Sequence, residues 1–390
     1  MASPPTALGV AVVGFGWMGQ VHSRAFTRLL QHYPDSPLAP RLVVAADPEA
    51  DRRAHATGAY GFDRAVADWG DAVTADDVDV VSVCGPNFVH REIAVAAAQA
   101  GKHVWVEKPA GRNLADTQAI ADAVQAAGVR SAVGFNYRNA PAVEAARALV
   151  GAGEIGEVET VVVEFLADYS AHPDGALSWR FDPEYAGTGV LGDLGSHAFD
   201  LGLFVAGDAV GPVTELVADT ATFIPQRPVA TGAVSHYATV AGGELGPVGN
   251  EDAASVLLRF ASGARGYVDT SRVAVGAQCR YRVEVRGTRG AVAWDFRRMQ
   301  ELQVCLGPHY QDAPWETRLV APGTGELVYF QPGAGMTMGY DDLKVIECER
   351  LVRSIRTGKD VGATIADAVT TARLVDAVVD SQDRRAWVSV

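Results

Sequence analysis

The fold of this 390-residue chain is decided by the stretch Leu8-Gly9-Val10-Ala11-Val12-Val13-Gly14-Phe15-Gly16-Trp17-Met18-Gly19. Its apolar first half predicts a buried strand over Leu8–Val13, and a helix is expected from Trp17 to Leu30. Between them, Gly14 permits a tight turn, Gly16 lets a pyrophosphate approach the backbone, and Gly19 lets helix and strand pack closely. The stretch therefore predicts a dinucleotide-binding turn, and the alternative is a Gly-rich turn without a ligand.

Outward from this stretch, short apolar runs alternate with Ala-rich segments of helical length. Strands are expected at Arg41–Ala46, Val78–Cys84, His103–Val106 and Ser131–Gly134, and helices at Glu92–Ala100 and Leu114–Ala127. Continuous apolar strands that alternate with helices predict an α/β domain, a doubly wound parallel sheet with helices on both faces. The stretch Pro34–Pro40 lengthens the link between the first helix and the second strand.

Beyond residue 138 the pattern changes to consecutive short strands with tight turns, which indicates an α+β domain with an open, mostly antiparallel sheet. Its expected strands are Glu157–Leu166, Ser255–Phe260, Ala264–Ser271, Arg280–Arg286, Ala291–Asp295 and Leu302–Leu306, and its expected helices are Pro141–Val150, Asp341–Ile355 and Ile365–Ser381. The division predicted from sequence is therefore a Rossmann domain over residues 7–138 and a second domain over residues 139–390.

Composition excludes several classes of protein. With 33 Lys and Arg against 47 Asp and Glu, the net charge of −14 argues against a nucleic-acid partner. There is no run of eighteen apolar residues and no basic, apolar leader at Met1, so no membrane span or signal peptide is expected and the predicted location is the cytoplasm. The four cysteines lie far apart in the sequence, and no ligand-like spacing, hence no metal site, is found among His32, His55, His172, His236 and His309.

Asp47 stands at the end of the second expected strand, where an acidic side chain contacts the adenosine ribose hydroxyls. A carboxylate at this place repels a 2′-phosphate, so NAD is favoured over NADP. Arg52 and Arg53 follow closely enough to keep NADP open as the alternative.

The tripeptide Glu107-Lys108-Pro109 follows the strand His103–Val106 and so lies at the carboxyl end of a parallel strand, where ligands bind in open α/β sheets. Lys108 is one of only four lysines in the chain. Its ammonium group is suited to holding a substrate hydroxyl and helping to take its proton. Pro109 fixes the turn and is a candidate for a cis peptide bond. The alternative is a surface Lys in a Pro turn.

The segment from Gly192 to Asp200 combines two acids and a histidine with an otherwise apolar helix. On an α-helix, Asp193, His197 and Asp200 would share one face. Such side chains are costly to bury unless they have partners or a chemical task. The alternative is a capping Asp and a hydrogen-bonded core His.

Taken in this order, the glycine fingerprint, the Glu-Lys-Pro turn and the Gly-Asp-x-x-x-His helix resemble the Gfo/Idh/MocA oxidoreductases over nearly the whole chain. Further matching stretches are Cys84–His90, Ala100–Val104 and Gly134–Arg138. The stretches Ser178–Phe181 and Gly187–Asp193 resemble the sugar and inositol dehydrogenase branch. Within it, the chain length and the link through Pro34–Pro40 are similar to levoglucosan dehydrogenases and glucoside 3-dehydrogenases.

This resemblance implies roles for individual residues. The catalytic residues would be Lys108, Asp193 and His197. The cofactor site would comprise Gly14, Phe15, Gly16, Trp17, Met18, Gly19, Asp47, Pro86, Asn87, His90, Glu107, Lys108, Asn136, Trp179 and Arg180. The substrate site would comprise Lys108, Asn136, Arg138, Asp193, His197 and Tyr340.

The expected activity is NAD-dependent oxidation of a secondary ring hydroxyl of a sugar, glycoside or inositol to a ketone. His197 is expected to be the general base, Asp193 to orient it, and Lys108 to bind the same hydroxyl. The resemblance also implies a homo-oligomer, a dimer or tetramer formed through the open sheet. Two other classes stay open: a noncatalytic NAD-binding regulator, and a glycosidase that uses NAD transiently.

Overall fold

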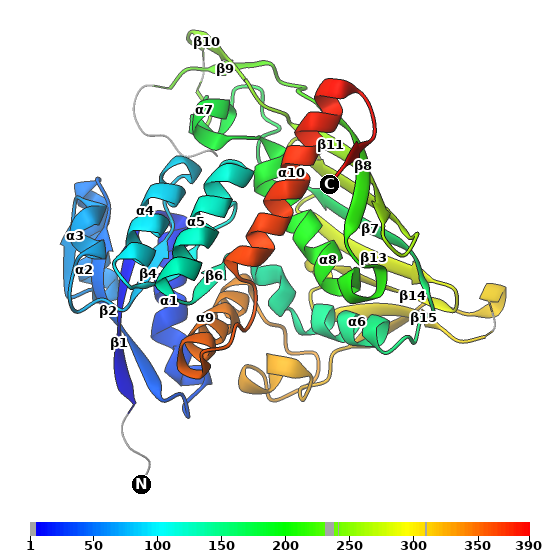
Figure 1. Ribbon diagram of the computed structural model, residues 1–390, viewed down its shortest axis with the longest axis horizontal. Helices are drawn as coiled ribbons and strands as arrows, with labels where there is room; N and C mark the ends of the chain where they lie inside the picture. Colours follow the sequence, from blue (N-terminus) through cyan, green and yellow to red (C-terminus); the bar gives the residue numbers. More distant parts are fainter. Residues whose placement is uncertain (1–4, 231–237, 241, 309) are drawn as a thin grey trace. The chain divides into compact units, whose positions relative to one another are not determined.

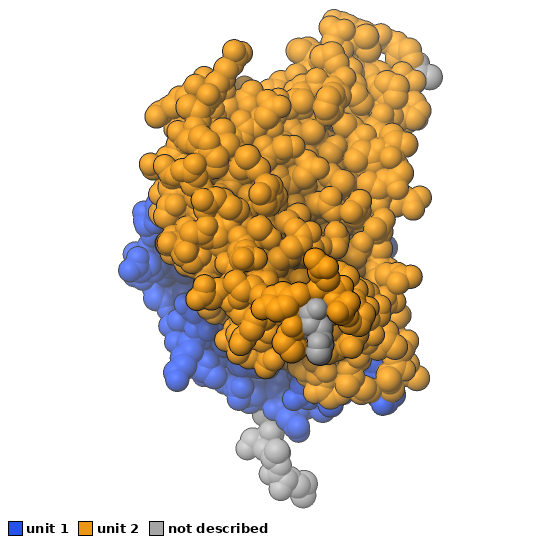
Figure 2. Space-filling view, turned by 90° about the vertical axis from the view of Figure 1, so that its right-hand side faces the viewer, with its two compact units in different colours: residues 1–139, 328–332, 338–370 blue, residues 140–327, 333–337, 371–390 orange. Residues whose placement is uncertain are grey.

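The computed structural model describes residues 5–230, 238–240, 242–308 and 310–390. His236 and His309, mentioned above, lie outside the described residues. Contacts within the chain define two compact units, which Figure 2 distinguishes by colour. The first comprises residues 1–139, 328–332 and 338–370, and the second comprises residues 140–327, 333–337 and 371–390.

The first unit contains a six-stranded parallel sheet in the order β3-β2-β1-β4-β5-β6. Its strands are β1 (Thr6–Val13), β2 (Leu38–Ala46), β3 (Arg64–Val66), β4 (Val80–Val83), β5 (His103–Val106) and β6 (Ser131–Val133). Its helices are α1 (Trp17–His32), α2 (Ala50–Tyr60), α3 (Trp69–Val73), α4 (Asn87–Gln99), α5 (Leu114–Ala127) and α9 (Tyr340–Thr357). The strand order reverses between β1 and β4, which is where ligands bind in doubly wound sheets.

Both faces of this sheet are covered by helices (Figure 1). Alternate residues of β1 enter two different hydrophobic clusters: Ala11 and Val13 pack with α3, α4 and α5, whereas Val10 and Val12 pack with α1 and α9. The predicted doubly wound sheet is confirmed. The sequence pattern does not reveal α2, because Ala56 is its one buried residue and a helix so exposed has no apolar stripe.

The second unit is built on a nine-stranded sheet in the order β16-β15-β14-β13-β7-β12-β11-β8-β17. Its strands are β7 (Val158–Leu166), β8 (Val213–Ala221), β11 (Ala253–Phe260), β12 (Arg265–Ser271), β13 (Arg280–Gly287), β14 (Gly290–Asp295), β15 (Glu301–Leu306), β16 (Glu316–Leu319) and β17 (Val388–Ser389). A separate pair is formed by β9 (Gln226–Pro228) and β10 (Leu245–Pro247). All neighbouring pairs of the large sheet are antiparallel except β7 and β12. The mostly antiparallel sheet predicted from the sequence is therefore confirmed.

Two helices, α6 (Pro141–Gly151) and α8 (Ser196–Val210), pack on one face of the large sheet. A short helix, α7 (Pro183–Ala186), lies in the connection before α8. Along β11 burial alternates residue by residue, so one face is buried and the other is exposed. Helix α10 (Ile365–Arg384) is divided between the units after Thr370.

The unit division differs in one respect from the domains predicted from sequence. The first boundary, after Asn139, lies one residue from the predicted one. Residues 338–370, however, make their contacts with the first unit, and α9 covers the Rossmann sheet beside α1. Within the part of the chain that is described, no helix is long and apolar enough to cross a membrane, and all four cysteines are free thiols.

Candidate active site

The three fingerprint glycines occupy the positions that their predicted tasks require. Gly14 has a φ of +87°, and a Cβ there would lie 2.6 Å from the backbone N of Gly85. At Gly19 a Cβ would lie 2.1 Å from the Gly14 carbonyl oxygen, so the close approach of α1 to β1 requires glycine. Gly16 precedes α1 and has nothing within 4 Å of its ideal Cβ position. The start of α1 is therefore open to a phosphate group, and the residues fit a dinucleotide.

Asp47, after β2, holds this turn from the interior. Its Oδ2 accepts a hydrogen bond of 2.7 Å from the Phe15 N–H, and its Oδ1 accepts one of 2.9 Å from the Glu49 N–H. The carboxylate is buried, and Arg52 Nη1 lies 3.4 Å from Oδ2. The Phe15 ring is also buried, edge-on to Tyr60. Both residues shape the turn, and the contact of Asp47 with a ribose stays a prediction.

An aromatic group lies beside the fingerprint within the first unit. The exposed Trp17 ring stacks on Tyr340, with 5.5 Å between ring centroids and an angle of 24°. Tyr137 meets Tyr340 edge-on at 6.0 Å, and the Tyr340 hydroxyl lies 3.8 Å from the Met18 sulfur. Tyr340 opens α9, so the packing of α9 onto the Rossmann sheet brings it to the fingerprint.

The loops after β4 and β5 are joined by His90. Its Nε2 lies 2.7 Å from the Gly85 carbonyl oxygen, and its Nδ1 lies 2.9 Å from the Pro109 carbonyl oxygen. Burial lowers the pKa of this imidazole, so a neutral ring donates to one of the two carbonyls. Pro86 precedes α4 and Asn87 begins it, and the Lys108–Pro109 bond is cis. His90 thus positions the turn that carries Lys108.

Asn136 and Arg138 both follow β6, but their side chains differ in hydrogen bonding. Asn136 is fully buried, and neither polar atom of its amide has a hydrogen-bond partner among the described residues. A buried amide left in this way is suited to a polar ligand. The Arg138 guanidinium donates to Asp367 Oδ1 at 2.9 Å and is almost buried. The contact of Arg138 with substrate stays a prediction.

In the second unit, the segment around Asp193 departs from the predicted α-helix. Residues Leu191–Gly195 form a π-helical turn, and α8 begins only at Ser196. A spacing of four residues spans slightly less than one turn of a π-helix and slightly more than one turn of an α-helix, so the common face of Asp193 and His197 stays a prediction. The expectation of a continuous α-helix is wrong at Asp193, whereas His197 and Asp200 both lie on α8.

The start of this helical segment is capped by Glu251, for which the sequence carries no local signal. Its Oε1 accepts hydrogen bonds from the backbone N–H groups of Gly189, at 2.8 Å, and Leu191, at 2.9 Å. A Cβ at Gly189 would lie 2.2 Å from the Glu251 carbonyl oxygen, so the close approach requires glycine. An acidic side chain at a helix N-terminus also stabilises the helix dipole.

Tyr169 is a second residue that the sequence did not reveal. Its hydroxyl donates a short hydrogen bond to Asp193 Oδ2. Burial first, and then the charge of Asp193, raise the pKa of Tyr169 well above its usual value, so the phenol keeps its proton. His197 is buried, and its backbone carbonyl accepts a 2.5 Å hydrogen bond from the hydroxyl of Tyr281, which stacks on Phe165 of β7. Tyr169, in the connection after β7, and Tyr281, on β13, thereby hold the two ends of the Asp193–His197 segment.

Trp179 and Arg180 lie in a 3₁₀ turn of the second unit. The Arg180 guanidinium lies 4.6 Å above the Trp179 ring centroid, and the Arg180 carbonyl accepts a hydrogen bond from Asn250. Their assignment to the cofactor site stays a prediction.

Comparison with known proteins identifies the family. Residues 8–135 match the oxidoreductase family with an NAD-binding Rossmann fold, and residues 143–293 match the GFO/IDH/MocA C-terminal domain. The chain belongs to the Gfo/Idh/MocA family of oxidoreductases. The resemblance predicted from sequence is confirmed.

Among members of this family, the chain is 35% identical to levoglucosan dehydrogenase of Pseudarthrobacter phenanthrenivorans, over 98% of each chain. It is 28% identical to inositol 2-dehydrogenase of Rhizobium meliloti, over 97% of this chain and 98% of that one. The solved structure of levoglucosan dehydrogenase in complex with NADH and levoglucosan is similar, with a TM-score of 0.91 and 32% identity over 99% of this chain and 100% of that one.

Proposed function

We propose that this Gfo/Idh/MocA protein is an NAD-dependent dehydrogenase that oxidises a secondary ring hydroxyl of a sugar, glycoside or cyclitol to a ketone. The observation that carries the proposal is the full-length similarity to levoglucosan dehydrogenase. It is supported by the presence, in one chain, of the open fingerprint turn and of the three residues Lys108, Asp193 and His197.

In the proposed reaction, NAD held by the fingerprint turn would supply the acceptor for the hydride that leaves the carbinol carbon. His197 takes the hydroxyl proton as the C=O bond forms. Lys108 binds the same oxygen and stabilises the negative charge that develops on it. Asp193 orients His197, and Tyr169 holds Asp193 through its hydroxyl. Asn136 contributes its buried amide to the bound cofactor or substrate.

The proposed partner in assembly is a second copy of the chain. A row of apolar residues crosses neighbouring strands on the sheet face away from α8: half-buried Val217 of β8, exposed Leu257 of β11, exposed Tyr267 of β12 and half-buried Val162 of β7. Leu257 and Tyr267 are 43% and 44% exposed. A row of apolar side chains on an open sheet is typical of a protein–protein interface.

A screen of levoglucosan, hexoses, glycosides and inositols with NAD, followed by the absorbance of the reduced cofactor, tests the activity. Reduced cofactor is expected to accumulate with at least one of these compounds. Lys108→Ala should lower kcat and weaken substrate binding together, whereas Lys359→Ala, an exposed lysine on the surface, serves as the matched control.

Two outcomes would replace the proposal. Cofactor binding without turnover of any compound would indicate a regulator. Cleavage of a glycoside without net formation of reduced cofactor would indicate a glycosidase that regenerates its NAD.

A further inference from the structure

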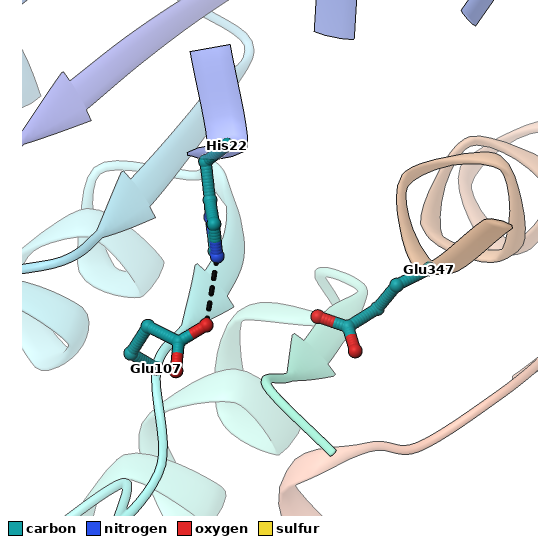
Figure 3. Close-up of side chains that lie close together, drawn as sticks. All are labelled: His22, Glu107 and Glu347. Carbon is teal, nitrogen blue, oxygen red and sulfur yellow. Dashed lines mark hydrogen bonds and ion pairs between the residues drawn. The ribbon is translucent and has the colours of Figure 1, made fainter. Parts of the chain in front are cut away.

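Behind the Glu107-Lys108-Pro109 turn, a histidine and two glutamates converge in the interior of the first unit. His22 comes from α1, Glu107 from the end of β5 and Glu347 from α9, and their side chains point toward one another (Figure 3). One nitrogen or carboxylate oxygen of each lies within 4.8 Å of those of the other two, and all three residues are buried. By donor type and spacing, such a group could hold a metal ion.

Here, however, a cation of the chain itself lies among the carboxylates. Lys344 Nζ donates to Glu107 Oε1 at 2.5 Å and to Glu347 Oε1 at 3.0 Å, and Lys344 is fully buried. Burial alone would lower the pKa of Lys344, but the two carboxylates raise it above its usual value. The ammonium group therefore stays charged and takes the position that a metal ion would need.

The remaining contacts fix the protonation of the group. Burial, and then the charge of Lys344, lower the pKa of His22 to about 4, so the ring is neutral at neutral pH. His22 Nε2 donates to Glu107 Oε1 at 2.8 Å, which leaves Nδ1 to accept from the Ser82 hydroxyl at 2.8 Å. The His22 ring also stacks on Trp105, with 3.7 Å between ring centroids.

Glu107 is thereby held at both of its oxygens. Burial favours its neutral form, but Lys344 and His22 outweigh burial and hold the pKa of Glu107 well below its usual range. Oε1 accepts from Lys344 and His22, while Oε2 accepts from the Lys108 N–H at 3.3 Å. A Cβ at Gly134 would lie 2.5 Å from Oε1, so the carboxylate fills the space beside β6.

We propose that Lys344 is a positioning residue for the oxidation, which acts through the Glu107 carboxylate to hold the backbone of Lys108 in place. The inference rests on the proposed function, in which the Lys108 side chain binds the reacting hydroxyl. It assigns to α9, 237 residues away in the sequence, a part in catalysis that the fingerprint and the Glu-Lys-Pro motif do not contain.

Lys344→Met tests the role of the positive charge, because Met is similar in length to Lys but carries no charge. We expect kcat for the sugar to fall roughly tenfold to a hundredfold, the usual cost of a small misplacement of a reacting group. The Kd for NADH should change less than about twofold, because the fingerprint turn is untouched. A purely structural role would lower Tm while leaving kcat unchanged at an assay temperature well below Tm, and that result would overturn the proposal.

Glu107→Gln tests the link between Lys344 and Lys108. In this variant the charge of Glu107, which raises the pKa of Glu347, is gone, so Glu347 can lose its proton and balance the charge of Lys344. The NH₂ group of the new Gln must face either the Lys108 N–H or the Lys344 ammonium. In the double variant that combines Glu107→Gln with Lys344→Met, kcat should be no lower than in Glu107→Gln alone. If the two losses of kcat add instead, Lys344 acts on another group and the proposal is overturned. If Lys344→Met does not fold, the kcat of Glu107→Gln decides the proposal by itself.

A labelling measurement keeps the test independent of the proposed function. The chain has four lysines, so limiting acetic anhydride and mass spectrometry give the acetylation of Lys108 relative to the exposed Lys359. Both variants should change this ratio by at least about threefold, because release of the turn changes the surroundings of the Lys108 amine and hence its reactivity. An unchanged ratio in folded variants would overturn the inference even if the wild type proves to oxidise sugars. A changed ratio supports it even if no sugar is turned over.

Discussion

Replacement of Glu347 by Gln tests whether a buried carboxyl of the first unit keeps its proton near neutral pH. Burial raises the pKa of Glu347 to about 7 from its usual 4.5, against the opposing charge of Lys344. The groups that face it are Lys344 on its own helix, Glu107 after β5, His22 on α1 and the Trp105 indole, which donates to Oε1 at 2.7 Å. Its Oε2 has no hydrogen-bond partner among the described residues, which suits the neutral form.

The sign of the effect follows from linkage. Because the pKa of Glu347 is higher in the folded chain than in the unfolded chain, its contribution to stability is fully present below pH 4.5 and is lost as the pH rises through 7. The difference, 7 − 4.5, corresponds to about 3 kcal/mol at about 1.4 kcal/mol per pH unit. Gln retains the Oε1 acceptor and does not titrate. The free energy of unfolding of Glu347→Gln, relative to the wild type, should therefore rise by about 3 kcal/mol between pH 4 and pH 8.

Urea unfolding followed by tryptophan fluorescence, at four pH values across this range, measures the difference. Glu92→Gln, an exposed glutamate on α4 of the same unit, is the matched control and should parallel the wild type. If Glu347→Gln also parallels the wild type from pH 4 to pH 8, the raised pKa of Glu347 is refuted, and with it the neutral carboxyl beside Lys344.

Further predictions concern the site itself. His197→Ala should lower kcat by roughly 10²–10⁴ while NADH binding survives; near-normal kcat from pH 6 to 9 would make Lys108 the base. Tyr169→Phe removes the hydroxyl that donates to Asp193 and should lower kcat about tenfold, with the pH–rate profile displaced because Asp193 no longer holds His197 as before. The wild type should use NAD more than about tenfold better than NADP. Asp47→Ala should reduce this preference for NAD over NADP. It should also raise KM for NAD, because the Asp47 carboxylate accepts a hydrogen bond from the Phe15 N–H of the fingerprint turn. Equal efficiency of the wild type with both cofactors would contradict the role of Asp47. Light scattering at micromolar concentration should report a multiple of 41.1 kDa, and Leu257→Glu together with Tyr267→Glu should reduce it to the monomer mass.

Local features of the protein were predictable wherever neighbouring residues carry the signal. The limits of β5 and α5, and the start of α1, agree with the expected ranges, because an apolar run or a helical stripe bounded by glycine is a property of a few consecutive residues. The same holds for Lys108, since a strand end followed by Glu-Lys-Pro can be read directly. At Asp193 this reasoning fails, because residue spacing alone does not distinguish a π turn from an α-helix.

By itself, the sequence determined the doubly wound sheet, the dinucleotide turn and the family. Only the tertiary structure decided that α9 packs on the Rossmann sheet, and therefore that Lys344 meets Glu107. It also decided that Glu251 caps the segment of Asp193 from 60 residues away. The physical reason is that periodicity records which side of an element is buried but not which distant element covers it. That choice depends on how side chains fit together, and so on the whole fold.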